Sequence, residues 1–114
     1  MTFDQYDEAV RSFAVYPTVG ANLVYPALKL NGEAGEVAEK VGKSWRDFGV
    51  KSGKYLPDED RQALLKEIGD CLWYCSTLAF TELGSSLKEV AQMNIDKLTS
   101  RKNRGVLGGS GDNR

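Results

Sequence analysis

The chain has 114 residues, which predicts a single domain, large enough for a hydrophobic core but small enough to favour oligomerisation. Hydrophobic residues make up 41% and charged residues 27% of the sequence, values typical of a soluble globular protein. No apolar run approaches about 18 residues, and the polar N-terminus does not resemble a signal peptide. We therefore expect a cytoplasmic protein that does not enter membranes.

The net charge of −1 is unevenly distributed. Residues 1–96 contain ten Lys/Arg and fifteen Asp/Glu, whereas residues 97–114 contain five Lys/Arg and one Asp. A basic C-terminal end beside an acidic body suits an anionic ligand that binds together with a metal ion. A weak nucleic-acid patch is the alternative. Because no aromatic side chains are interleaved with these charges, we expect no stable nucleic-acid binding.

Hydrophobic spacing predicts a first amphipathic helix over residues 3–14 and a second that begins near 23–26. The second helix contains Glu33 and Glu36, within Gly32-Glu33-Ala34-Gly35-Glu36. Two carboxylates three residues apart project from one side of a helix. Taken alone, this pair fits a solvated surface as well as a functional site.

A glycine- and lysine-rich loop over 46–57 leads to a third helix, which begins near Asp58 and stops at Gly84. From Leu64 to Phe80 this helix is apolar almost all round, which predicts a place in the middle of the core. Cys71 and Cys75 lie one turn apart in it, as expected of reduced, buried thiols rather than a disulfide or zinc pair. A polar stripe nevertheless follows the helix: Glu67, Asp70, Tyr74, Thr77 and Thr81.

Buried carboxylates such as Glu67 and Asp70 are costly unless their charge is compensated. The chain has no histidine, and Lys66 lies off the polar stripe. A buried Arg or proton uptake could compensate one acidic pair. Two pairs on two helices favour Mg²⁺, a hard cation that prefers carboxylate oxygens.

Ser86-Leu87-Lys88-Glu89 is a capping box that predicts the start of a fourth helix. Asn94, Lys97 and Arg101 share one side of this helix, and solvated surface is their default role. We expect a helical domain over 1–104 and a Gly-rich basic tail over 105–114. The tail is either disordered or a flap whose N–H groups and Arg114 could meet phosphate.

The expected fold is therefore all-α, with four helices of which the second and third are antiparallel. Packed helices lie about 8–10 Å apart, so Glu33, Glu36, Glu67 and Asp70 could converge on one cavity and bind one or more Mg²⁺. This set favours metal-assisted attack of water on a phosphoryl group, with one carboxylate as general base. The absence of histidine excludes an activated Ser or Cys and a Glu-x-x-His di-iron site.

These residues resemble a known family. Gly-Glu-Ala-Gly-Glu-Val-Ala-Glu at 32–39, and Glu-Ile-Gly-Asp at 67–70 followed by Leu72, Trp73 and Tyr74, are similar to MazG. These are all-α nucleoside triphosphate pyrophosphohydrolases with a Glu-x-x-Glu and then a Glu-x-x-Asp pair. The resemblance extends over about 23–104, and 109–114 is similar to short, single-domain phage and bacterial members.

The resemblance implies Mg²⁺-dependent hydrolysis of a (deoxy)nucleoside triphosphate to monophosphate and pyrophosphate, with Mn²⁺ as a possible substitute. By similarity, Glu33, Glu36, Glu67 and Asp70 are the catalytic metal ligands in a homodimer or homotetramer. Tyr74 and Lys97 would contact the substrate, with Asn94 and Arg101 as further candidates. Trp45 or Phe48 could stack on the base, although core packing is the alternative for Trp45. Two alternatives stay open: a non-catalytic metal- or nucleotide-binding module, and a pyrophosphohydrolase for a biosynthetic nucleotide such as phosphoribosyl-ATP.

Overall fold

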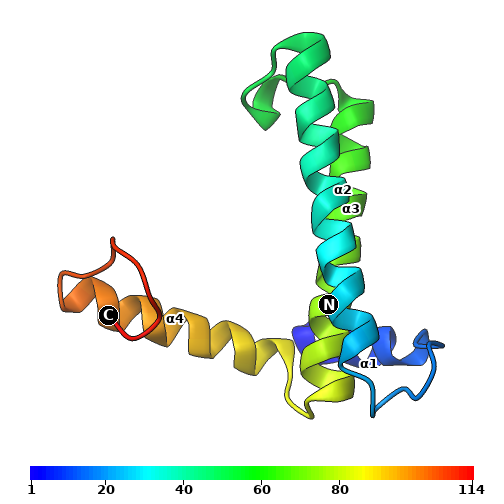
Figure 1. The fold of residues 1–114 in the computed structure, drawn as a ribbon, viewed down its shortest axis with the longest axis vertical. Helices are drawn as coiled ribbons and strands as arrows, with labels where there is room; N and C mark the ends of the chain where they lie inside the picture. The colour runs from blue at the N-terminus through cyan, green and yellow to red at the C-terminus, as the bar shows by residue number, and fades with distance from the viewer.

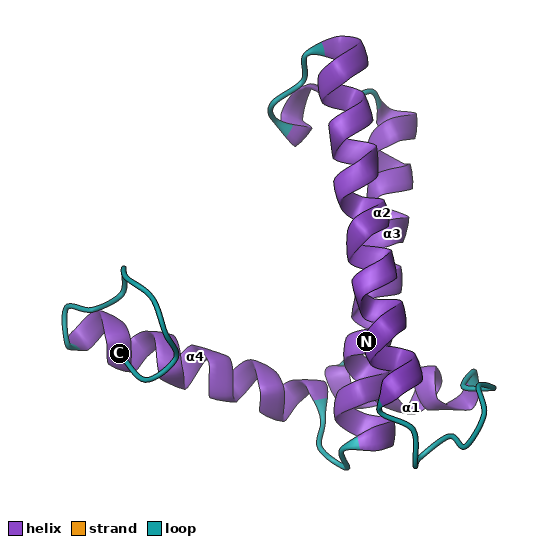
Figure 2. Cartoon of the chain, viewed as in Figure 1, coloured by secondary structure: helices purple, strands orange, loops and turns teal.

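The computed structural model describes all 114 residues, and they contain helices but no strand (Figures 1 and 2). Helices α2 and α3 run antiparallel and pack along their lengths (Figure 1). The all-α class, the four helices and the antiparallel pair are therefore confirmed. None of the helices is both long enough and apolar enough to cross a membrane. The elements are α1 (Phe3–Ser12), α2 (Val24–Phe48), a short 3₁₀ turn η1 (Gly53–Tyr55), α3 (Asp58–Ser76), a π-helical segment η2 (Thr77–Glu82) and α4 (Leu87–Asn103).

Local signals account for the ends of these helices. The Thr2 hydroxyl accepts a hydrogen bond from the Gln5 N–H at 3.1 Å, and the Gln5 side-chain oxygen accepts one from the Thr2 N–H at 2.8 Å, which caps α1. Gly49 and Gly84 follow α2 and η2 in the left-handed region, with φ of +63° and +67°, where glycine is favoured. Ser86 caps α4, as predicted, by accepting from the Glu89 N–H.

The chain is L-shaped. The α2–α3 hairpin is one arm, α1 and η2 form its base, and α4 projects sideways from that base as the second arm (Figure 1). The radius of gyration is 16.9 Å, whereas a compact domain of this length has about 13 Å. A single chain thus leaves α4 without a partner along most of its length.

The expectation that α3 lies in the middle of a core is wrong for the single chain. Leu65 and Ile68 are 48% and 47% exposed, and only nine of the 114 residues are buried. The apolar side of α4 is also open, with Met93 70% exposed. The reason is that α4 turns away from the hairpin instead of packing on it (Figure 1). Periodicity identified the apolar side chains, but it could not say whether the same chain covers them.

A buried carboxylate connects the two arms. Asp7 of α1 is 1% exposed and accepts hydrogen bonds from the Ser76 hydroxyl at 2.6 Å and the Leu87 N–H at 3.0 Å. Leu87 is the first residue of α4, where N–H groups have no partner inside the helix. Asp7 therefore caps α4 from a different helix and fixes the point from which the second arm starts.

Candidate metal centre

Three acidic side chains meet on the α2–α3 hairpin. Glu33 comes from α2, and Glu67 and Asp70 come from α3. One carboxylate oxygen from each lies within 4.8 Å of the other two. The Glu33 and Glu67 side chains are 18% and 20% exposed, and Asp70 is exposed. The antiparallel packing of the two helices thus creates a cluster of three carboxylates that opens to solvent.

The spacing of these oxygens fits a divalent cation. Ligands of an octahedral Mg²⁺ lie about 2.1 Å from the ion, so two of them are at most roughly 4.2 Å apart. The observed 4.8 Å limit is slightly larger. Carboxylate side chains can close that difference by small rotations. The donor set is entirely oxygen, which suits Mg²⁺ and Mn²⁺ and does not suit Zn²⁺ sites of Cys and His.

Glu36 does not belong to this cluster. It is exposed on α2, whereas Glu33 is half-buried against α3. Residues three apart on a helix differ by about 60° around its axis. Both members of such a pair face a neighbouring helix only when the line along which the two helices pack runs between them. On α2 the line of packing against α3 runs closer to Glu33. The structure therefore brings together three of the four predicted ligands.

Two lysines that sequence reasoning did not assign to the site pair with its carboxylates. Lys40 Nζ lies 3.3 Å from Glu67, and Lys29 Nζ lies 3.6 Å from Glu33. Their positions, seven residues after and four before Glu33, place them on the same side of α2. This spacing was the available signal. Both lysines are flexible and partly exposed, so an incoming cation or phosphate can displace their ammonium groups from the carboxylates.

Tyr74 stands one turn beyond Asp70, as expected, and is joined by an unpredicted tyrosine. Burial, hydrogen bonding with Tyr25, and the nearby charges of Glu33 and Asp70 raise the pKa of Tyr74 to about 12. The phenol is therefore protonated at neutral pH and can donate a hydrogen bond. The Tyr25 ring in turn stacks on Tyr16 at 5.1 Å between centroids. Tyr74 therefore lies close to the carboxylate cluster, with Tyr25 beside it.

The other predicted substrate residues lie elsewhere in the single chain. Asn94, Lys97 and Arg101 are on α4, the arm that points away from the hairpin (Figure 1). Trp45 is near the far end of α2, half-exposed, with Lys51 Nζ 4.8 Å from its ring centroid. The structure does not bring these four side chains to the carboxylates of their own chain.

A hollow of about 310 Å³ lies beside the carboxylate cluster, towards the end of the hairpin. It shares Lys40 with the cluster, and Leu64 lies one turn before Glu67. Phe48 borders this hollow, whereas Trp45 does not. Of the two aromatic residues considered for the base, Phe48 is therefore the one that faces a cavity.

The family model described as the MazG nucleotide pyrophosphohydrolase domain matches residues 26–106 of the chain. The chain belongs to the MazG family. The MazG match contains α3, η2, α4 and almost all of α2, and hence all three clustered carboxylates. The chain is also similar to the protein named Gene 37 protein of Mycobacterium phage L5, with 44% identity over 119 residues and complete coverage of both chains. No solved structure matches the sequence.

Proposed function

We propose that this MazG protein hydrolyses a (deoxy)nucleoside triphosphate to the monophosphate and pyrophosphate in a Mg²⁺-dependent reaction. The observation that carries the proposal is the convergence of Glu33, Glu67 and Asp70 from two helices within 4.8 Å. Three oxygen donors leave coordination positions free, and Mg²⁺ commonly fills such positions with substrate phosphates and water. Family membership supplies the reaction class.

Glu33, Glu67 and Asp70 would hold the cation, with Mn²⁺ as an alternative to Mg²⁺. When bound, the cation supplies Lewis-acid polarisation of phosphate oxygens and activates the attacking water. Glu36, exposed one turn from Glu33, acts either as a fourth ligand or as the base that accepts the proton from water. The two roles are separable, because loss of a ligand weakens metal binding and loss of a base lowers kcat alone.

The remaining groups of the hairpin position the substrate. Lys40 and Lys29 exchange their carboxylate partners for phosphate oxygens, where a charge-assisted hydrogen bond is stronger. The protonated Tyr74 hydroxyl donates a further hydrogen bond. The hollow bordered by Phe48 is the best-placed site for a nucleobase.

We further propose a homodimer or homotetramer in which α4 of one copy serves the hairpin of another. This supports a substrate role for Asn94 and Lys97, which their own hairpin cannot use. The uncovered apolar sides of α3 and α4 favour such an arrangement, because exposed patches of this kind mark interaction surfaces. Arg101 is a weaker substrate candidate, since its guanidinium already binds main-chain oxygens of the tail.

The test is product identification with a panel of canonical, modified and biosynthetic nucleotides in Mg²⁺ buffer. We expect pyrophosphate and a monophosphate as first products, and loss of turnover in Glu67→Gln and Asp70→Asn. Glu39→Gln is the matched control, because Glu39 is an exposed carboxylate on α2 that pairs with Lys43 at 2.9 Å. Orthophosphate as first product, or nucleotide binding without turnover across the panel, would contradict the proposal.

A further inference from the structure

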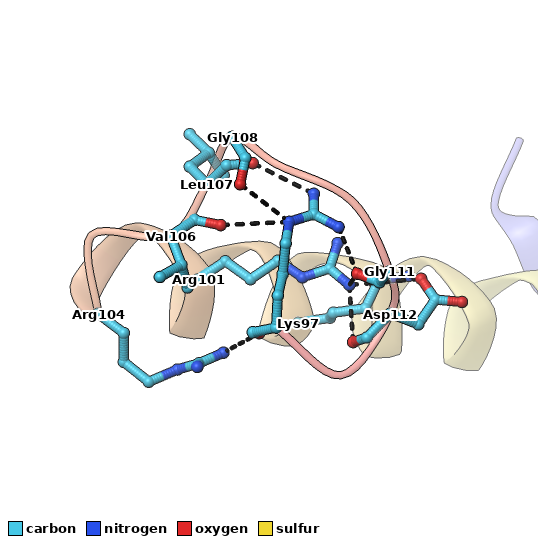
Figure 3. Close-up of polar contacts among 9 residues, drawn as sticks. Lys97, Arg101, Arg104, Val106, Leu107, Gly108, Gly111 and Asp112 are labelled. Carbon is cyan, nitrogen blue, oxygen red and sulfur yellow. Dashed lines mark hydrogen bonds and ion pairs between the residues drawn. The ribbon is translucent and has the colours of Figure 1, made fainter.

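The last residues of the chain fold into a defined loop on the end of α4, although their sequence shows no periodicity. Three arginines donate hydrogen bonds to its main-chain carbonyls, and Figure 3 labels two of them, Arg101 and Arg104. Arg114 Nε donates to the Gly108 and Val106 carbonyls at 3.0 and 3.3 Å, and its Nη atoms donate to the Leu107 and Gly111 carbonyls. Arg114 therefore turns into the loop and is not the group that meets a ligand.

Arg101 holds the other side of the loop. Its side chain is 5% exposed, and Nη2 donates to the Asp112 carbonyl at 2.7 Å and the Gly111 carbonyl at 3.2 Å (Figure 3). Five main-chain carbonyls between residues 106 and 112 are thus occupied by two guanidinium groups. Hydrogen bonds from these side chains therefore hold the loop in its conformation.

The N–H groups of the same loop are free. No main-chain N–H from residue 107 to 114 donates a hydrogen bond within the chain. Gly109 and Gly111 are left-handed, with φ of +96° and +86°, and Ser110 between them is not. Successive N–H groups in a turn of this kind point towards one side and form an anion-binding concavity, or nest. We call residues 109–112 the C-terminal nest.

The charge around the nest favours an anion. Residues 97–114 carry five Lys/Arg and one acidic residue, Asp112. The Asp112 carboxylate is 85% exposed and is already engaged by Arg101 at 3.3 Å and Lys97 at 3.5 Å. Hydrogen bonding from Arg101, together with Lys97, lowers the pKa of Asp112, so this carboxylate is charged. Lys97 is partly exposed and can turn to a stronger anion beside it.

We propose that the C-terminal nest is a phosphate-binding site at the end of α4, apart from the carboxylate cluster of its own chain, that takes condensed phosphate. The ligand is the phosphate chain of the nucleotide or the pyrophosphate released from it, a choice that rests on the proposed function. The free N–H groups of 109–112 bind the phosphate oxygens, and Lys97 adds positive charge. Arg101 and Arg114 act indirectly, by holding the carbonyls away from the ligand.

The test follows main-chain amide shifts by NMR in Mg²⁺-free buffer, in a Glu67→Gln/Asp70→Asn background that removes two clustered carboxylates. Pyrophosphate, a non-hydrolysable dNTP analogue and a short single-stranded DNA are titrated separately. We expect pyrophosphate to shift the amides of 109–112. A response to the dNTP analogue as well indicates the bound nucleotide as the source, and a response to pyrophosphate alone indicates the released product.

Two glycine variants separate backbone geometry from charge. Gly111→Ala and Gly108→Ala both add a methyl group to open space, but only Gly111 is left-handed. We expect pyrophosphate affinity to fall about five- to thirtyfold in Gly111→Ala and to stay unchanged in Gly108→Ala. Arg114→Lys keeps the charge and loses the forked donors, so it should also weaken binding.

Three results would overturn the nest: no amide shift with pyrophosphate, equal affinity in Gly111→Ala and Gly108→Ala, or a response to DNA alone. None of them depends on turnover. If the nest binds pyrophosphate but no triphosphate is hydrolysed by the unmodified protein, only the proposed function fails. If turnover occurs without these shifts, only the nest fails.

Discussion

Replacing Asp7 by alanine should strongly destabilise the protein. The carboxylate is 1% exposed and accepts one hydrogen bond from Ser76 and one from the Leu87 N–H. Each hydrogen bond to a charged group is worth about 1.5–3 kcal/mol, so we expect a loss of about 3–6 kcal/mol in the free energy of unfolding. That is a large part of the stability of an ordinary small domain, about 5–15 kcal/mol.

Asp7→Asn keeps the shape and one acceptor oxygen, and should cost about half as much. Glu8→Gln is the control, because Glu8 is exposed on the same helix and should change stability by less than about 0.5 kcal/mol. The assay is urea unfolding at one fixed protein concentration, since association would otherwise alter the apparent stability. Hydrogen exchange at Leu87 gives a second, local readout, which we expect to accelerate in both Asp7 variants.

An Asp7→Ala protein with unfolding free energy close to that of Glu8→Gln would refute the reasoning. So would unchanged exchange at Leu87, because the N–H would then have another partner. Either result would mean that Asp7 does not fix the start of α4, and that the L shape has a different cause.

Other consequences concern charges near and far from the carboxylate cluster. Lys40→Gln should raise Mg²⁺ affinity by up to about fivefold, because an exposed ion pair worth up to about 1 kcal/mol no longer competes for Glu67. Lys43→Gln should leave Mg²⁺ affinity unchanged, because Lys43 pairs with Glu39. Equal Mg²⁺ affinities of the two variants in calorimetry would contradict this prediction. At Glu82, burial raises the carboxyl pKa, but hydrogen bonds from Tyr16 and from the Asn22 and Gly20 N–H groups outweigh it and lower the pKa. The carboxylate therefore stabilises the 17–22 loop above pH about 4.5, and this stabilisation is lost as pH falls through the lowered pKa. Glu82→Gln should cost about 1–2 kcal/mol at neutral pH and progressively less in acid, and a pH-independent difference in unfolding free energy would argue against this assignment.

Features encoded by local sequence were predictable. The cap at Ser86 and the stop at Gly84 act within one turn, so the helix ends that they set followed from residue type and spacing. The convergence of Glu33 with Glu67 and Asp70 was also predictable, because two neighbouring antiparallel helices can pack in only a few registers.

Features set by contacts between distant residues were not predictable. Asp7 accepts a hydrogen bond from the first residue of α4, and its partners Ser76 and Leu87 lie 69 and 80 residues away along the chain. The long side chain of Lys40 reaches Glu67 across the hairpin. Glu36 lies about 60° from Glu33 around the axis of α2, and therefore outside the cluster. The composition of the tail does not distinguish disorder from a phosphate flap, and nothing in it indicates that Arg114 turns inward.

A Mg²⁺ titration by calorimetry tests the central claim most directly, because it measures whether clustered carboxylates from two helices hold a cation. The unmodified protein should bind Mg²⁺, Asp70→Asn should bind it much more weakly, and Glu39→Gln should match the unmodified protein. Equal Mg²⁺ binding by Asp70→Asn and Glu39→Gln would contradict the account, since the cation would then be held outside the cluster formed by Glu33, Glu67 and Asp70.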